Sequence, residues 1–239
     1  MKIIETQDFK VRLINGGEYL NSAQLLRGRI FLRQEKTEKD KFDKFCQHLV
    51  VIDKRINQVV GTYRLLLGSI AEKNIGFYSE TEFDLGNIKR SCKGEVLEIG
   101  RACVHPDYRK YLIITLLWRG VLSYVEYNKV DFIFGCASIE DSHPLKIGKI
   151  FRFFKDNFFS PPRFRVFPLE DKRFSYIKYL DEYNKEEVLN MLTSLIRGYL
   201  SIGAFVCGEP AWDRVFDTVD FFMLLDVKRI NNSFLRKFL

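Results

Sequence analysis

The sequence predicts an α/β domain in which helices cover both faces of a central sheet. Three observations lead to this expectation. Apolar residues recur at helical spacing in several stretches, β-rich apolar runs lie between those stretches, and one pair of runs is close enough to form a hairpin. Hydrophobic residues make up 46% of the 239 residues, which is enough for a sizeable core, and the 29% of charged residues is typical of a folded chain.

The first half of the chain is predicted to contain two helices and three strands. Residues 19–35 carry apolar side chains at helical spacing, and the charged residues 36–44 are expected to form a loop or a short helix. The remaining elements are a hairpin of strands 48–53 and 59–67, a short helix at 81–89, and a buried strand at 96–104. His105-Pro106-Asp107 is expected to end that last strand.

The second half is predicted to begin with a long apolar helix and a fully buried strand. The expected elements, in order, are a helix at 111–127, a strand at 131–139, a helix within 141–158 that starts at His143-Pro144, an irregular stretch at 160–179, a helix at 185–200, strands at 204–206 and 219–225, and a short basic helix at the C-terminus. No internal repeat or low-complexity segment interrupts this order.

Charge and cysteine usage limit the classes of partner and site. The 38 basic and 31 acidic side chains give a net charge of +7, which favours an acidic protein, an anionic membrane surface or nucleic acid as a partner. The five cysteines are scattered and form no Cys-x-x-Cys pair, so we expect buried thiols and no metal site. No signal peptide and no run of ~20 apolar residues is evident, which predicts a cytoplasmic protein that contacts at most the inner membrane face.

Two opposite charges, Glu98 and Arg101, lie inside the predicted strand at 96–104 and form the leading candidate site. Buried charges are costly unless they are paired or used. Side chains three positions apart in a regular strand face opposite ways. Gly100 between them can mark a bulge that turns both side chains toward one cleft. A structural ion pair without a catalytic role is the alternative interpretation.

Several stretches of the chain form a distinctive set. They are LLRGRIF at 25–31, VVGTYRLLL at 59–67, EIGRACVHPDYR at 98–109, LLWRGVLSYV at 116–125, and GYLSIGAF with DRVFDTVDFFMLL within 198–225. As a set they resemble the GNAT-like N-acyltransferases, in particular the ornithine N-acyltransferases that make lyso-ornithine lipid and are often labelled hemolysin-like. The resemblance implies a three-layer GNAT-like fold with a mixed central sheet. It also implies a core at 1–140 and a C-terminal extension at 141–239, packed on the core as part of the same domain.

The first half also resembles the acyl-homoserine-lactone synthases, which share this fold. The matching positions are Arg27, Phe31, Asp40, Asp43, Arg64, Glu98 and Arg101. One departure from the ornithine branch is Gln47, because Cys-Gln-His stands where Cys-Asp-His is expected. This departure bears on the acceptor, so acylation of another amino acid or of an autoinducer-type amine stays open beside ornithine.

The resemblance implies a role for each of these side chains. Acyl transfer from a thioester needs a neutral amine, so Glu98 is the expected base and Arg101 its partner or a substrate clamp. Arg27 and Arg64 are expected to bind a carboxylate and Asp40 and Asp43 an ammonium group, while Phe31 lines an acyl tunnel. The alternatives are a solvated charge run for the aspartates and plain core for the phenylalanine.

The segment after the strand at 96–104 bears on the acyl donor. Relatives that use acetyl-CoA cradle its pyrophosphate on a glycine-rich turn, whereas residues 109–114 of this chain contain no glycine. An acyl carrier protein needs no such cradle, because it brings the acyl group on its own 4'-phosphopantetheine. Arg109, Lys110 and Arg119 are the expected contacts to that acidic protein, and a solvated helix start is the alternative. No separate cofactor, metal or nucleotide is expected.

Residues 151–179 hold eight of the 22 phenylalanines and carry a net positive charge. Aromatic and basic residues together suit the interface of an anionic membrane, to which a lipid product must pass. A packed subdomain with a solvated rim is the alternative. No nucleic-acid-binding motif accompanies the region, so we expect no nucleic-acid partner. A non-catalytic, membrane-associated protein of hemolysin type is the rival to the enzyme.

Overall fold

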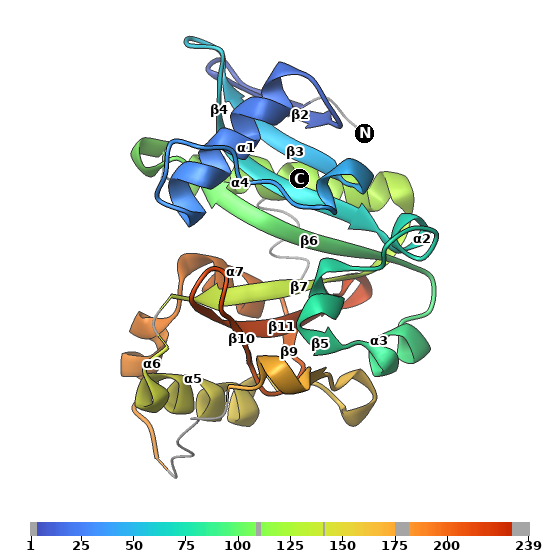
Figure 1. Ribbon diagram of the computed structural model, residues 1–239, viewed down its shortest axis with the longest axis vertical. Helices are drawn as coiled ribbons and strands as arrows, with labels where there is room; N and C mark the ends of the chain where they lie inside the picture. The colour runs from blue at the N-terminus through green and yellow to red at the C-terminus, as the bar shows by residue number, and fades with distance from the viewer. Residues whose placement is uncertain (1–3, 109–110, 141, 175–181, 231–239) are drawn as a thin grey trace. The chain divides into compact units, whose positions relative to one another are not determined.

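The computed structural model describes residues 4–108, 111–140, 142–174 and 182–230 (Figure 1). The chain folds into two compact units. The first contains Met1–Phe77 and Glu95–Val130, and the second contains Tyr78–Gly94 and the chain from Asp131 onward to Asn231. The chain thus enters the second unit, returns to the first and enters the second again. Each unit is therefore built from segments that are not consecutive in the sequence. The boundary expected at residue 140 stays a prediction.

The first unit has an antiparallel sheet in the order β1-β2-β3-β4-β6. Its strands are β1 (Ile4–Glu5), β2 (Phe9–Ile14), β3 (Gln47–Asp53), β4 (Gln58–Leu67) and β6 (Glu95–Val104). The hairpin of β3 and β4 and the strand β6 confirm the predicted elements. Strands β1 and β2 were not predicted, because β1 has two residues and the apolar residues of the six-residue β2 alternate with charged side chains over too short a run to stand out.

Helices cover both faces of this sheet. Consecutive residues of a strand point to opposite sides, so neighbouring residues of β3 contact different helices. On one side, α4 (Tyr111–Asn128) lies so close to β3 that a Cβ atom at Gly120 would stand 2.6 Å from a Leu49 methyl carbon. On the other side, α1 (Glu18–Phe31) packs against Val50, the next residue of β3. The short helix α2 (Gly68–Ala71) follows β4. The expected helices at 19–35 and 111–127 are confirmed within a few residues.

The second unit contains an antiparallel sheet in which β11 is the central strand. The strands are β7 (Val130–Ile139), β9 (Phe205–Val206), β10 (Ala211–Asp213) and β11 (Thr218–Asp226), with a separate pair of β5 (Phe83–Asp84) and β8 (Phe167–Pro168). The helices are α3 (Gly86–Ser91), α5 (Pro144–Asn157), α6 (Lys185–Met191) and α7 (Ser194–Ser201). The predicted α/β class is therefore confirmed in both units.

Aromatic side chains form much of the core of the second unit. From α5, Phe151 and Phe154 contact Phe221 of β11, while Phe222 stacks on Phe134 from the other face of the strand. Five of the eight phenylalanines at 151–179 are buried, which supports the packed interpretation for those residues. They are Phe151, Phe153, Phe154, Phe164 and Phe174. Membrane contact stays a prediction that vesicle flotation can test.

Two expectations about the elements were wrong in detail. The helix expected at 81–89 is a 3₁₀ turn, strand β5 and helix α3. The single helix expected at 185–200 is interrupted, because the Thr193 side chain accepts a hydrogen bond from the Ile196 amide and caps a new helix, α7. Strand β10 was not predicted. The basic C-terminal helix lies outside the described residues.

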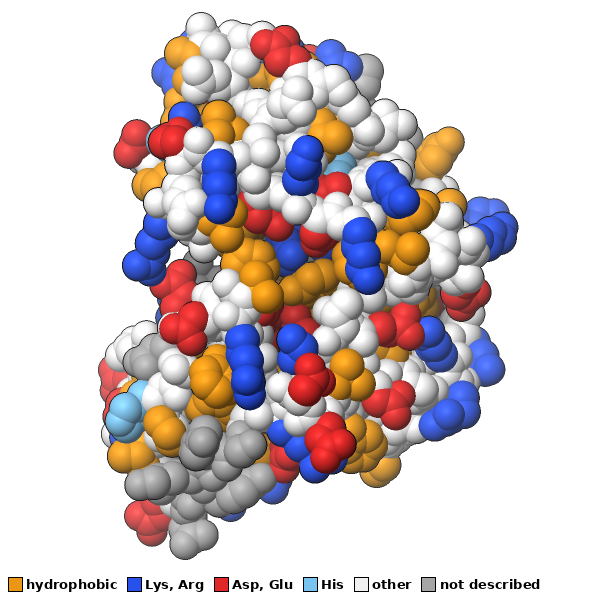
Figure 2. Space-filling view, in the orientation of Figure 1, with side chains coloured by type: hydrophobic (Ala, Val, Ile, Leu, Met, Phe, Trp, Pro, Cys, Tyr) orange, Lys and Arg blue, Asp and Glu red, His pale blue; other side chains and the backbone are white. Residues whose placement is uncertain are grey.

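The surface carries both signs of charge. On the face shown in Figure 2, acidic and basic side chains are interspersed, so the net charge of +7 does not gather in one patch there. Among the described residues, no helix combines the length and the apolar character that crossing a bilayer requires.

Candidate active site

Strand β6 has a bulge at the expected position. Thr62 of β4 pairs with Cys103, whereas Arg64 pairs with Gly100, so two residues of β6 lie opposite the single Tyr63. Arg101 adopts a φ of +50°, a left-handed conformation that is uncommon outside glycine. The bulge therefore rests on Arg101 itself and not on the conformational freedom of Gly100. Left-handed backbone of this kind is retained where the surroundings hold it in place.

The bulge brings Arg101 to the side of the sheet that Glu98 and Arg64 share. Glu98 pairs with Leu66, and Arg64 lies two residues before Leu66, so both side chains point to the same face. Arg101 donates to Asp40 Oδ2 over 3.0 Å, and Arg64 also donates to that carboxylate over 2.7 Å. The expected bulge is confirmed and places these charges on one side of the sheet, while the cleft stays a prediction.

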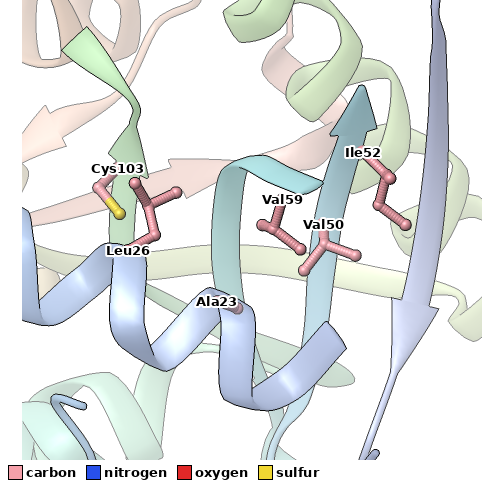
Figure 3. Packing of buried hydrophobic residues seen from close by; sticks show 6 residues of the cluster. All are labelled: Ala23, Leu26, Val50, Ile52, Val59 and Cys103. Carbon is pink, nitrogen blue, oxygen red and sulfur yellow. The ribbon is translucent and has the colours of Figure 1, made fainter. Parts of the chain in front are cut away.

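Helix α1 supplies the third arginine from the same side of the sheet. Its Ala23 and Leu26 pack on β3, β4 and β6, as Figure 3 shows for the cluster Ala23, Leu26, Val50, Ile52, Val59 and Cys103. Arg27 follows Leu26 and has no exposed surface. It donates to Asp43 over 2.5 and 3.1 Å and to Glu38 over 2.6 Å. Phe31, expected in an acyl tunnel, is partly buried against the same cluster.

Glu38 is a member of this network that sequence reasoning missed. One carboxylate oxygen accepts from Arg27 and the other accepts from Arg101 over 3.2 Å, so Glu38 joins the helix to the bulge. The loop that carries Glu38 lies against α1, where the Lys36 carbonyl oxygen stands 1.6 Å from the position of a Cβ on Gly28. Only glycine permits this approach, and Gly28 directly after Arg27 was the available sequence indication.

The residues of this network of arginines and carboxylates differ in how exposed their side chains are, and the difference indicates different roles. Arg27, Glu38 and Asp43 are buried and satisfy one another, which favours positioning roles for these three residues. The Asp40 side chain is 22% exposed and that of Arg101 is 11% exposed, so these two form the accessible edge. The expectation that Arg27 binds a substrate carboxylate conflicts with its complete burial. For Asp40 and Arg64, substrate binding stays a prediction.

Glu98 is buried, with 6% of its surface exposed, on the face that carries the arginines. Its charge and those of Asp43 and Asp40 act on Cys46, which lies before β3. Burial is the main cause that raises the pKa of the Cys46 thiol to about 12, although Arg64 opposes it. A thiol with so high a pKa is a poor nucleophile at neutral pH. Cys46 is therefore not a candidate nucleophile, and Glu98 stays the predicted base.

Asp43 is held as a carboxylate by its arginine partners. Burial acts to raise its pKa, but hydrogen bonds and charge interactions with Arg27, together with Arg64, outweigh burial and hold the pKa well below the usual range. The Asp43 side chain also accepts from the Asp40 amide over 2.9 Å. Asp43 thus fixes the start of the turn that presents Asp40 to the accessible edge.

Two sequence features of β3 are not part of the accessible edge, although His48 lies beside Asp43, with 3.7 Å between its Nε2 and the Asp43 Oδ1. Gln47 accepts a hydrogen bond from Tyr124 of α4 over 2.7 Å, so it belongs to the α4 side of the sheet. His48 and Asp53 match an His-x4-Asp acyltransferase pattern, but their odd spacing in a regular strand places them on opposite faces. Asp53 accepts from Arg55 and from Tyr108, consistent with a structural role.

The imidazole of His48 is expected to make the stability of the protein depend on pH. Burial lowers its pKa to about 4, with Asp43 opposing and Arg27 reinforcing the shift. Between about pH 6.5 and 4 the unfolded chain binds a proton that the folded protein does not, so the free energy of unfolding falls as the pH falls. The loss reaches about 3 kcal/mol. Denaturant titrations from pH 7 to 4 should show a shallower decline for His48→Gln.

The partly exposed His105, at the end of β6, offers the matched control for that measurement. His105→Gln should leave the slope of stability against pH close to that of the wild type. Equal slopes for His48→Gln and the wild type would refute the assignment.

Of the three residues expected to contact a carrier protein, the structure describes one. Arg109 and Lys110 lie outside the described residues. Arg119 is half-buried on α4. The helix begins at Tyr111 with no glycine in its first turns, as the sequence indicated.

Comparison with known sequences identifies similar acyltransferases. The model of the acetyltransferase (GNAT) domain family matches residues 26–119. The L-ornithine N(alpha)-acyltransferase of Brucella abortus is 32% identical over 252 residues, which cover 95% of this chain and 87% of that protein. The enzyme of the same name from Agrobacterium fabrum is 30% identical over 244 residues, covering 95% of this chain and 83% of that protein.

Solved structures show the same fold at low sequence identity. An N-acyl amino acid synthase from uncultured soil microbes, FeeM, has a TM-score of 0.54 at 9% identity and covers 92% of this chain and 91% of its own. The AHL synthase LasI has a TM-score of 0.51 at 11% identity and covers 94% and 90% of the two chains. Both similarities extend beyond residue 140, so they include the expected C-terminal extension.

Proposed function

The chain belongs to the family of L-ornithine N(alpha)-acyltransferases, and from this premise we propose that it transfers a fatty acyl group from acyl carrier protein to the α-amine of ornithine. The 32% identity that extends over 95% of the chain carries the proposal. The product is lyso-ornithine lipid, and the acyl chain is a 3-hydroxy fatty acid. The rival of a non-catalytic protein is set aside, because the chain is an acyltransferase by family.

Glu98 has the chemistry that the reaction requires. The acceptor α-ammonium loses one proton through Glu98 to solvent, and the neutral nitrogen attacks the thioester carbonyl carbon. The nitrogen of the tetrahedral intermediate then gives a second proton to the Glu98 carboxylate, the carbon–sulfur bond breaks, and Glu98 passes that proton to the pantetheine sulfur, which leaves as a thiol. Base catalysis of this kind contributes about 10²–10⁴-fold to a rate. The buried position of Glu98 beside arginines supports this assignment.

The network of arginines and carboxylates supports binding of a charged amino acid. Asp40 offers its exposed edge to an ammonium group of the acceptor, and Arg101 offers the adjoining positive edge to the acceptor carboxylate. Arg64 fixes the position of Asp40, because it donates a hydrogen bond to each Asp40 carboxylate oxygen over 2.7 Å. Arg27, Glu38 and Asp43 keep this edge in place. An acceptor with two ammonium groups and a carboxylate matches the charges offered.

The donor prediction is tested with purified protein, ornithine and either 3-hydroxyacyl carrier protein or the matching acyl-CoA. We expect the acyl amide, detected by mass spectrometry, with kcat/KM at least about tenfold higher for the carrier protein, a preference of 1.4 kcal/mol. The double variant Arg109→Glu, Lys110→Glu should raise KM for the carrier protein through slower encounter, an effect that weakens with salt.

An acceptor panel completes the experiment. Lysine, 2,4-diaminobutyrate and glutamine serve as acceptors beside ornithine under the same conditions. Equal rates with acyl-CoA would contradict the carrier-protein donor, and a preferred acceptor other than ornithine would contradict the acceptor. Each result leaves the other assignment intact.

A further inference from the structure

The second unit contains a group of two buried carboxyl side chains and one half-buried thiol that the acyl-transfer chemistry does not use. Cys136 of β7 pairs with Phe222 of β11, and Asp220 lies two residues before Phe222, so Cys136 and Asp220 point to the same face of the sheet. Glu82 precedes β5, whose Phe83 packs against Phe222 on that face. One ligand atom from each of Glu82, Cys136 and Asp220 lies within 4.8 Å of the other two.

Glu82 is the unusual member of this group. It is 2% exposed, and neither of its carboxylate oxygens has a hydrogen-bond partner among the described residues. Burial of a carboxyl group whose oxygens lack a well-formed hydrogen bond is unfavourable, because the lost contacts with water are not fully replaced. One of its oxygens lies within 4.8 Å of the Cys136 sulfur and of an Asp220 carboxylate oxygen, a position where a cation would contact all three groups.

We propose that Glu82, Cys136 and Asp220 form a binding site for a divalent metal ion, with Zn²⁺ as the preferred ion. The ligand set combines one sulfur with two carboxylates. Zn²⁺ accepts both kinds of ligand, whereas Mg²⁺ and Ca²⁺ take oxygen ligands. Partial exposure of Cys136 leaves a route for the ion to enter.

Neighbouring groups support the site as an outer shell does in known metal centres. The Thr218 hydroxyl donates to Asp220 over 2.8 Å and orients that carboxylate. Asp213, from the adjacent β10, accepts from Tyr78 over 3.0 Å and from the Val215 amide over 2.8 Å. Asp213 adds negative charge near the three ligands without being one of them.

Protons and the ion compete for this site. Zinc binds these side chains as carboxylate and thiolate, so their protons must leave when the ion binds. Binding of Zn²⁺ displaces the proton of Glu82 and the proton of the Cys136 thiol, so metal affinity rises with pH. The ion joins the segment before β5 to strands β7 and β11, which gives it a structural role independent of acyl transfer.

The test uses the full chain, stripped of metal with a chelator and titrated with Zn²⁺ alone. We expect one bound ion per chain and a rise in the midpoint of thermal unfolding. Glu82→Gln and Cys136→Ser should each lower the affinity at least about tenfold. Glu80→Gln and Cys92→Ser, which change the same residue types in the same unit, should leave it unchanged.

A spectroscopic measurement keeps the proposal falsifiable should a variant unfold. Co²⁺ bound to the wild type should show a thiolate-to-metal charge-transfer band, which free Co²⁺ in the same buffer lacks. Absence of that band, absence of stoichiometric binding, or equal affinity in Cys136→Ser and Cys92→Ser would overturn the proposal. Stabilisation by ornithine alone, lost in Glu82→Gln, would show that the group binds an ammonium and would also overturn it.

Discussion

Replacing Glu98 with glutamine is expected to lower kcat/KM for amide formation by about 10²–10⁴-fold. Glutamine keeps the size and hydrogen-bonding ability of the side chain but cannot accept the proton of the acceptor ammonium. Glu98 lies on β6 among the residues that the bulge gathers, and its small exposed surface separates it from bulk water. The measurement is initial-rate kinetics with acyl carrier protein and ornithine, at matched protein stability.

The pH dependence distinguishes a base from a merely structural residue. Without Glu98 the reaction depends on acceptor that has already lost its proton, so the rate of Glu98→Gln should rise more steeply with pH than the wild-type rate. Glu95→Gln is the matched control, since Glu95 lies on the same strand and accepts from the Ser69 amide. Ordinary turnover by Glu98→Gln would exclude Glu98 as the base.

Replacing Arg27 with methionine is expected to lower the free energy of unfolding by about 3–5 kcal/mol. The substitution preserves the apolar stem of the side chain and removes the guanidinium. Glu38 and Asp43 are then left buried and lose their closest positive partner. Breaking one side of a buried ion network costs far more than the intact network contributes. Equilibrium denaturation in urea or guanidinium measures the loss.

Two further variants show whether the loss comes from the stranded carboxylates. Adding Glu38→Gln and Asp43→Asn to Arg27→Met should restore part of the stability, because the uncompensated charges disappear. Arg29→Met, two residues along the same helix, breaks an exposed pair with Glu35 and should cost no more than about 1 kcal/mol. Similar losses for Arg27→Met and Arg29→Met would refute the network argument.

The elements that the sequence predicted well are those with a long, regular pattern. Strands β4 and β6 and helices α1 and α4 lie within a few residues of their expected positions, because burial on one or both faces repeats over at least nine residues. Strands β5 and β8, two residues each, carry no such pattern. The interruption at Thr193 depends on a capping hydrogen bond that only the folded backbone offers.

The sequence predicted most residues of the candidate site but few of the hydrogen bonds between them. The bulge at Arg101 matches the expectation drawn from Gly100, although the left-handed residue is the arginine. Arg27 was expected to meet substrate, and its burial against two carboxylates instead makes it a positioning residue. Glu38 was missed because it lies in a charged run that resembles an ordinary solvated loop.

The sequence by itself determined the strand that carries Glu98 and Arg101 and the absence of glycine before the long helix, because both are properties of consecutive residues. Tertiary structure alone decided which charges meet. Glu38 reaches Arg101 across 63 residues, and Glu82 reaches Cys136 and Asp220 from separate segments. Such distances depend on strand register and on the path of each loop, which no local pattern of residues specifies.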